Sequence, residues 1–132
     1  MTDDRDLCPC GSSKLFASCC KPLLSGTRKA DTAEALMRSR YCAYLHRNSD
    51  YLLATWHSST KPDCLDLVGI PQPDWEALEM LGTSAGGRTD TEGRVEFIAH
   101  YRLDGMPGRL HENSRFRRVD GQWYYVDGDI RA

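Results

Sequence analysis

Four of the chain's six cysteines lie close together near its start, and thiols at this density are typical of a metal site. They form two short pairs, with one residue inside the first, none inside the second and eight residues between them: Cys8, Cys10, Cys19 and Cys20. Zn²⁺ prefers four soft or borderline ligands in a tetrahedron, and two pairs on a loop that folds back can supply them. Pro9 stiffens the first pair, and Gly11 permits the turn that follows it. The spacing therefore predicts a structural zinc site.

Disulfides are the first alternative for six cysteines in a short chain. We expect reduced thiols instead, because the first seven residues contain no apolar signal sequence. A bridge between the adjacent Cys19 and Cys20 would also be strained, whereas two thiolates on one metal need only diverge slightly. The other cysteines, Cys42 and Cys64, stand singly in contexts typical of ordinary packing. Redox chemistry and other thiophilic metals, such as Cu(I) or iron, are the remaining alternatives.

The stretch from Cys8 to Cys20 resembles the SEC-C motif, a zinc knuckle best known from the C-terminal tail of the SecA preprotein translocase ATPase. The matching features are Cys-Pro-Cys-Gly-Ser, the aromatic Phe16 and the closing cysteine pair, while Ser13 stands where the motif usually has a glycine. The resemblance implies one zinc ion on the four cysteines. In SecA the similar knuckle is a docking site for a chaperone and for ribosomes, so the resemblance also implies a protein partner.

A knuckle this small has almost no interior, so its side chains that bind no metal must face outward or rest on a neighbour. Exposed aromatic and basic groups on a rigid, metal-held turn suit docking to another protein. We therefore expect the partner to contact Lys14, Phe16 and Lys21.

Length and charge limit the remaining classes of partner. The 132 residues fit one domain plus a small appendage, with 40% hydrophobic residues to build a core. The net charge of −2 gives no general attraction to nucleic acid. The basic cluster Arg115, Arg117 and Arg118 is typical of a solvated strand face, and an RNA contact there is the weaker alternative.

The apolar runs are too short to span a bilayer, so we expect a cytoplasmic protein without membrane contact.

Apolar residues at helical spacing follow a basic, turn-rich linker at residues 25–29. The expected helical segments are residues 31–48, residues 50–56 and, as a single turn, residues 64–67. Asp31 or Thr32 can cap the first helix, and Asp50 can cap the second.

The second half of the chain has the alternation and turn residues of antiparallel strands. The expected strands are residues 75–81, 95–102, 110–119 and 123–126. Asp120 and Gly121 form a hairpin signal between the last two strands. Helices followed by such a sheet predict an α+β domain, which we place at residues 30–132, after a zinc knuckle at residues 1–24.

Five stretches of the chain resemble the YchJ family of small bacterial proteins, and the similarity extends over nearly all residues after the first few. These stretches are residues 33–41, 51–57, 95–97, 111–116 and 123–128. The resemblance implies a SEC-C motif followed by a domain similar to nuclear transport factor 2, the cystatin-like cone of helices on a curved antiparallel sheet. That family has no established activity, so the resemblance implies a fold and not a reaction.

A cone fold leaves a cavity between its helices and its sheet, and polar residues stand where the wall of that cavity is expected. Strand alternation places a carboxylate and a hydroxyl on the same face as core residues. The residues expected to line the cavity are Tyr41, His57, His100, Glu112 and Ser114. We expect Glu112 to be buried and paired with an arginine, with Arg38 and Arg40 as the leading candidates. The histidines can be ordinary satisfied side chains.

We therefore expect a zinc-binding protein-interaction module with a small-ligand pocket and no catalytic activity. No second carboxylate has a spacing that suggests acid and base roles, and no glycine elbow surrounds Ser114. The alternative is a small-molecule enzyme, isomerase- or hydrolase-like, that uses Glu112 or a histidine as its base. A buried cavity that touches both His100 and Glu112 would favour the enzyme.

Overall fold

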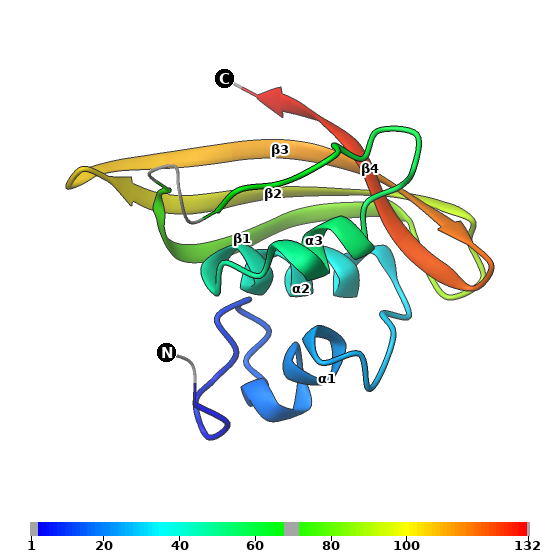
Figure 1. Cartoon of the computed structure of the whole chain (residues 1–132), viewed down its shortest axis with the longest axis horizontal. Helices are drawn as coiled ribbons and strands as arrows, with labels where there is room; N and C mark the ends of the chain where they lie inside the picture. The colour runs from blue at the N-terminus through cyan, green and yellow to red at the C-terminus, as the bar shows by residue number, and fades with distance from the viewer. Residues whose placement is uncertain (1–2, 68–71, 132) are drawn as a thin grey trace.

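The computed structural model describes residues 3–67 and 72–131 and places helices against one face of a curved sheet (Figure 1). The helical elements are η1 (Phe16–Ser18), α1 (Lys21–Leu24), α2 (Ala33–Leu45) and α3 (Ser49–Ala54). The strands are β1 (Asp74–Ala85), β2 (Glu92–Leu103), β3 (Met106–Val119) and β4 (Gln122–Arg131). The predicted α+β class is confirmed, and each strand runs beyond the range expected from the sequence.

The sheet is a meander in which each strand pairs antiparallel with the next, in the order β1-β2-β3-β4. The β2–β3 pairing is regular along the whole of β2, whereas β1 carries two irregularities and the β3–β4 pairing one. Such bulges increase the local twist, which agrees with the curvature of the sheet. Asp120 and Gly121 both have positive φ, 51° and 79°, as the expected tight hairpin requires.

Helix α2 is shorter than the sequence predicts because a left-handed residue ends it. Thr32 is the N-cap, since its Oγ1 accepts from the Ala35 amide at 3.1 Å. At the other end Arg47 has a φ of 58°, and the amides of Arg47 and Asn48 return to the carbonyls of Tyr44 and Ala43. This Schellman arrangement usually uses glycine, so the sequence carries no obvious stop signal there.

Asn48, and not Asp50, caps the next helix. Its Oδ1 accepts from the Tyr51 amide at 3.1 Å, and α3 begins at Ser49. The helical turn expected at residues 64–67 is absent from the structure of that segment. Leu67 is instead buried with Ala43 and Leu52 in a small second hydrophobic cluster, and this packing determines the local conformation.

The knuckle shares the main hydrophobic core with the cone. Its buried residues Cys8, Cys10, Phe16 and Cys20 belong to the same cluster as residues of α2 and of the sheet. The N-terminal segment and α1 lie on the side of α2 away from the sheet, which makes three layers (Figure 1). The described part of the predicted knuckle, residues 3–24, is therefore packed onto the predicted cone domain.

Among the described residues, no helix has the length and apolar character needed to cross a membrane.

Gly93, near the start of β2, offers a test of how closely β2 packs against the backbone at Gly86 and against Ala33 of α2. A Cβ on Gly93 would overlap the backbone of Gly86 and meet the Ala33 Cβ at 3.3 Å, whereas a Cβ on Gly82 of β1 would meet nothing within 4 Å. We expect Gly93→Ala to lower the free energy of unfolding by about 1–3 kcal/mol, because the backbone must shift. The matched Gly82→Ala should change it by less than about 0.5 kcal/mol. Equal denaturation midpoints for the two variants would contradict this packing.

Candidate metal centre and ligand cavity

The four predicted metal ligands meet in one cluster. The Sγ atoms of Cys8, Cys10, Cys19 and Cys20 all lie within 4.8 Å of one another. Cys10 is 3.6 Å from Cys19, and Cys19 is 3.9 Å from Cys20. A tetrahedron with Zn–S bonds of about 2.3 Å has edges of about 3.8 Å. The donor set and its spacing therefore fit a zinc ion.

Local backbone structure folds the two cysteine pairs onto each other. Leu7 and Leu15 form an isolated antiparallel bridge, and the Cys8 amide donates to the Lys14 carbonyl at 2.7 Å. Gly11 has a φ of 82°, and a Cβ there would lie 3.1 Å from the Leu78 carbonyl oxygen of β1. Ser13 also has a positive φ, 68°, which explains why the resembling motif usually has glycine at this position.

A fifth cysteine contacts the cluster from α2. Cys42 is completely buried, and its Sγ lies 3.6 Å from that of Cys8. The sequence pattern assigned it to ordinary packing, because a single cysteine on the apolar stripe of a helix carries no metal signature. Cys64 is exposed.

The expected docking residues differ in exposure. Lys14 is exposed, and the exposed Lys21 pairs with Asp4 at 2.6 Å. Phe16 is 6% exposed, so its predicted role as an exposed contact is wrong. Its ring packs edge-on against His46, the C-cap of α2, with the centroids 5.5 Å apart, because the knuckle rests on this helix.

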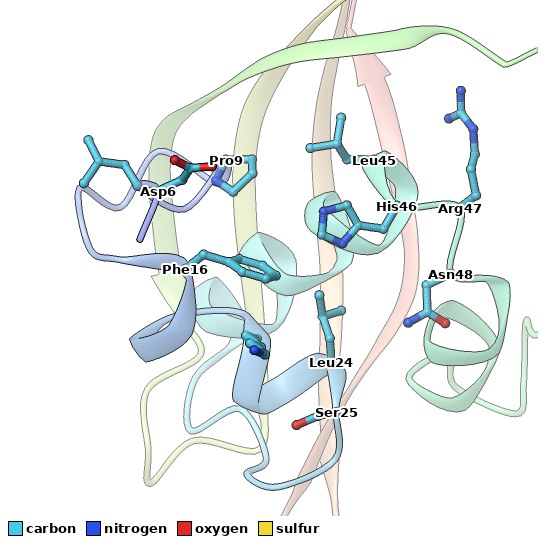
Figure 2. Close-up of a pocket in the computed structure, with 11 residues that line it drawn as sticks. Asp6, Pro9, Phe16, Leu24, Ser25, Leu45, His46, Arg47 and Asn48 are labelled. Atoms are coloured by element: carbon cyan, nitrogen blue, oxygen red, sulfur yellow. The ribbon is translucent and has the colours of Figure 1, made fainter. Parts of the chain in front are cut away.

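An open groove runs between the knuckle and the C-terminal end of α2. It has a volume of about 1020 Å³, and Figure 2 shows Phe16, Leu24 and His46 facing into it. Leu7 also lines this groove and is 63% exposed. The apolar surface of the knuckle therefore continues from Leu7 and Leu15 into the groove.

A second, more enclosed cavity lies between α2 and the sheet. Its volume is about 200 Å³. Its walls are mainly aromatic and aliphatic, with one cation and one carboxylate among them: Met37, Arg40, Tyr41, Tyr44, Trp75, Phe97, Ala99, Leu110, Glu112 and Tyr125. The predicted pocket residues Tyr41 and Glu112 thus line one cavity.

Glu112 is buried as predicted, but the predicted ion pair is wrong. Its Oε2 accepts from the Ser114 hydroxyl and from the Tyr125 hydroxyl, the latter at 3.2 Å. No described lysine, arginine or histidine nitrogen lies within 4.0 Å of its carboxylate. Arg38 binds Glu34 at 3.0 Å and faces the knuckle, because residues two apart on a helix point in different directions.

Arg40 is a buried cation held by neutral groups. Its Nη1 donates to the Leu52 carbonyl and to Thr55 Oγ1, both at 2.8 Å. Its guanidinium lies over the rings of Trp56 and Tyr125, 5.1 Å and 4.6 Å from their centroids. Burial lowers the pKa of Arg40 from its ordinary value.

Neutral hydrogen-bonding groups complete the cavity wall. The Trp75 Nε1 is buried and has no hydrogen-bond partner among the described residues. Burial raises the pKa of Tyr41 to about 12, and it also raises the pKa of Tyr44 and Tyr125. These phenols are therefore protonated at neutral pH. The cavity offers donors, one carboxylate and a large apolar area.

The predicted histidines do not line this cavity. His57 bonds to Ser59 Oγ at 2.7 Å, and its ring packs against Tyr124. His100 bonds to Glu79 on the outer face of the sheet at 3.3 Å, because strand alternation turns Ala99 and not His100 toward the cavity. The cavity therefore lacks the joint contact with His100 and Glu112 that would favour an enzyme.

The basic strand residues are mostly paired with acidic ones. Arg115 contacts Asp127 and Asp129, and Arg117 contacts Glu92 at 3.6 Å. This pairing favours the solvated strand face over an RNA contact.

Two family profiles match the chain. The profile described as "YchJ, middle NTF2-like domain" matches residues 32–128, and the profile of the SEC-C motif matches residues 5–22. These matches agree with the cone domain and the cysteine cluster.

Curated relatives match over most of the chain. A UPF0225 protein of Streptomyces coelicolor is 51% identical, over 93% of this chain and 94% of its own. A UPF0225 protein of Geobacter sulfurreducens is 49% identical, over 93% of this chain and 78% of its own.

Two solved structures have the same fold. The solution structure of a SEC-C motif containing protein from Rhodopseudomonas palustris is 39% identical and has a TM-score of 0.84, covering 96% of this chain and all of that one. The crystal structure of a SEC-C motif containing protein from Psychrobacter arcticus is 26% identical and has a TM-score of 0.78, covering 100% of this chain and 86% of that one. By profile, by relatives and by structure, the chain belongs to the UPF0225 (YchJ) family, which combines a SEC-C motif with an NTF2-like domain.

Proposed function

We propose that this chain is a binding protein in which zinc, held by Cys8, Cys10, Cys19 and Cys20, stabilises the knuckle that packs on a cone domain whose cavity takes a small ligand. The observation that carries the ligand proposal is the cavity between α2 and the sheet, one of whose lining residues, Trp75, has a buried indole N–H without a partner among the described residues. A buried donor without a partner costs free energy, and a ligand acceptor removes that cost. A concave, mainly apolar space with a few convergent polar groups is the usual form of a small-molecule site.

The residues that line this cavity suit the binding of a small molecule better than they suit catalysis. An isomerase- or hydrolase-like reaction would have to use Glu112 as its base, because no histidine lines the cavity among the described residues. Glu112 is also fixed in place by Ser114 and Tyr125.

The proposed ligand is uncharged. Arg40 and Glu112 line the same cavity without contacting each other, so a charged ligand meets a like charge as well as an opposite one. A hydroxyl or amide can donate to the carboxylate and accept from the indole of Trp75. The apolar walls accommodate the rest of such a molecule.

The cysteine cluster also suggests the cellular compartment in which the protein works. Zinc thiolates require reduced cysteines, and the cytoplasm keeps thiols reduced. We therefore propose that the protein is cytoplasmic.

The zinc proposal predicts one zinc per chain in protein produced with zinc available. Structural zinc contributes on the order of 10 kcal/mol of apparent binding free energy at neutral pH. Because the knuckle shares its core with α2, chelation should lower the melting temperature of the whole chain. Native mass spectrometry and thermal melting measure both effects.

Two cysteine variants control this experiment. Cys10→Ser should lose the metal, and the exposed Cys64→Ser should keep it. Well under one zinc per wild-type chain would contradict the proposal.

The ligand proposal is tested with three probes that share one ring: benzyl alcohol, benzylamine and benzoate. We expect the alcohol to shift the Trp75 indole resonance in ¹H–¹⁵N spectra at a lower concentration than either charged probe. The indoles of Trp56 and Trp123 bond to Thr60 and to the Asp31 carbonyl, so they serve as internal references.

Ala99→Leu should abolish the shift by filling the cavity, whereas the exposed Ala77→Leu on β1 should retain it. A stronger response to benzylamine or benzoate would contradict an uncharged ligand. Failure of all three probes to move the Trp75 resonance would contradict the cavity as a site for molecules of this class.

We further propose that the knuckle docks a protein partner, and the resemblance to the SecA knuckle favours a chaperone or a ribosome-associated protein. The exposed side chains available for this are Leu7, Leu15 and Lys14, with Leu7 63% and Leu15 48% exposed. An exposed apolar pair beside a basic group suits an apolar partner surface with acidic neighbours. Phe16 serves as the packing support beneath this surface.

This docking proposal predicts that Leu15→Ser weakens capture of a specific partner by roughly tenfold or more, as for an interface hot spot. Leu103→Ser is the matched control, because Leu103 is 42% exposed at the far end of β2. Quantitative mass spectrometry of proteins captured from cytoplasmic extract compares the two, with zinc content checked in each. Equal recovery of every partner by both variants would exclude docking through Leu15.

A further inference from the structure

The metal centre contains more thiols than a tetrahedral ion needs. Cys42 Sγ lies 3.6 Å from Cys8 Sγ, a separation equal to that of the motif pair Cys10 and Cys19. Both distances are close to the edge of about 3.8 Å expected between two sulfur ligands on one zinc ion. Cys42 therefore occupies a position from which it can reach the same ion.

Among the four motif ligands, Cys19 is the most accessible one. Cys19 is partly exposed, whereas Cys8, Cys10 and Cys20 are buried. The Cys19 Sγ also lies 3.1 Å from the Ser12 hydroxyl, within a surface hollow that is lined by polar residues. One ligand thus faces solvent, while an unused thiol lies in the core.

We propose that the centre is a five-thiol site in which Cys42 takes the fourth ligand position when Cys19 leaves it. The proposal rests on the zinc site of the proposed function. In the exchange the bond between zinc and the Cys19 sulfur would break and the bond between zinc and the Cys42 sulfur would form. The Cys42 thiol gives its proton to solvent, and the released Cys19 thiolate takes one up from solvent. No electron is transferred.

The exchange changes which parts of the chain are bonded to the metal. The motif cysteines all lie before residue 21, whereas Cys42 lies in α2, directly after the cavity residues Arg40 and Tyr41. With Cys42 as a ligand, the metal is coordinated directly by α2, which forms one wall of the cavity. The site then tolerates loss of its most exposed ligand without losing the ion.

The test compares four full-length variants with the wild type: Cys19→Ser, Cys42→Ala, Cys19→Ser with Cys64→Ser, and Cys19→Ser with Cys42→Ala. Native mass spectrometry gives zinc per chain. Replacement of zinc by Co²⁺ gives the number of thiolate ligands from the intensity of the sulfur-to-metal charge-transfer band.

We expect four thiolates in the wild type and in Cys42→Ala, because the motif tetrad is intact in both. Cys19→Ser should also show one metal and four thiolates, and adding Cys64→Ser should change nothing. Only Cys19→Ser with Cys42→Ala should fall to three thiolates, with metal affinity lower by at least about tenfold.

A three-thiolate spectrum in Cys19→Ser, with an affinity equal to that of its combination with Cys42→Ala, would overturn the proposal. The variant Cys19→Ser with Cys64→Ser decides the matter even if Cys42→Ala folds poorly, because a fourth thiolate there can come only from Cys42. A wild-type chain without metal would instead refute the zinc site itself, so the two failures are distinguishable.

Discussion

Helix α2 is packed on both sides, with the sheet against one face and the cysteine cluster against the other. Arg38 points toward the knuckle and donates to the Cys10 carbonyl at 2.6 Å, while Arg40 points toward the cavity. Protonated thiols are weak hydrogen-bonding groups, so on the knuckle side burial of Phe16 supplies about 1.5–3 kcal/mol of the attraction. Under the zinc proposal, an ion on the four cysteines would add on the order of 10 kcal/mol to the stability of the knuckle. The firmness with which the outer face of α2 is held would then depend on the metal.

On the inner face, two opposite charges remain apart because each has neutral partners. Arg40 binds a carbonyl near the C-terminal end of α3, where cations are favoured, and lies over two aromatic rings. Glu112 accepts from two hydroxyls. Tyr125 takes part in both arrangements, with its ring under the guanidinium and its hydroxyl on the carboxylate. An ion pair would close the space between these groups, and its absence leaves the cavity open.

The sequence predicts the features that local chemistry determines. The cysteine spacing, the Asp-Gly hairpin and the alternation that buries Glu112 and Ser114 all reappear in the structure. Features that depend on tertiary packing were not predictable in the same way. Arg47 ends α2 in a conformation that favours glycine, and the burial of Phe16 requires knowing that the knuckle rests on α2. Whether Ala99 or His100 faces the cavity depends on which phase of the β2 alternation is turned inward, and the continuous apolar run at residues 97–99 does not reveal it.

A SEC-C motif can be appended to a domain by a linker, but here it is built into the packing. Gly11 approaches the backbone of β1 so closely that a side chain would crowd the Leu78 carbonyl. Arg38 bonds to the knuckle backbone, and Cys42 meets the cysteine cluster. Deleting residues 1–24 would therefore expose the outer face of α2, so loss of a partner after such a deletion would not identify the docking surface. Single changes at exposed knuckle residues separate docking from folding, because they leave this shared core intact.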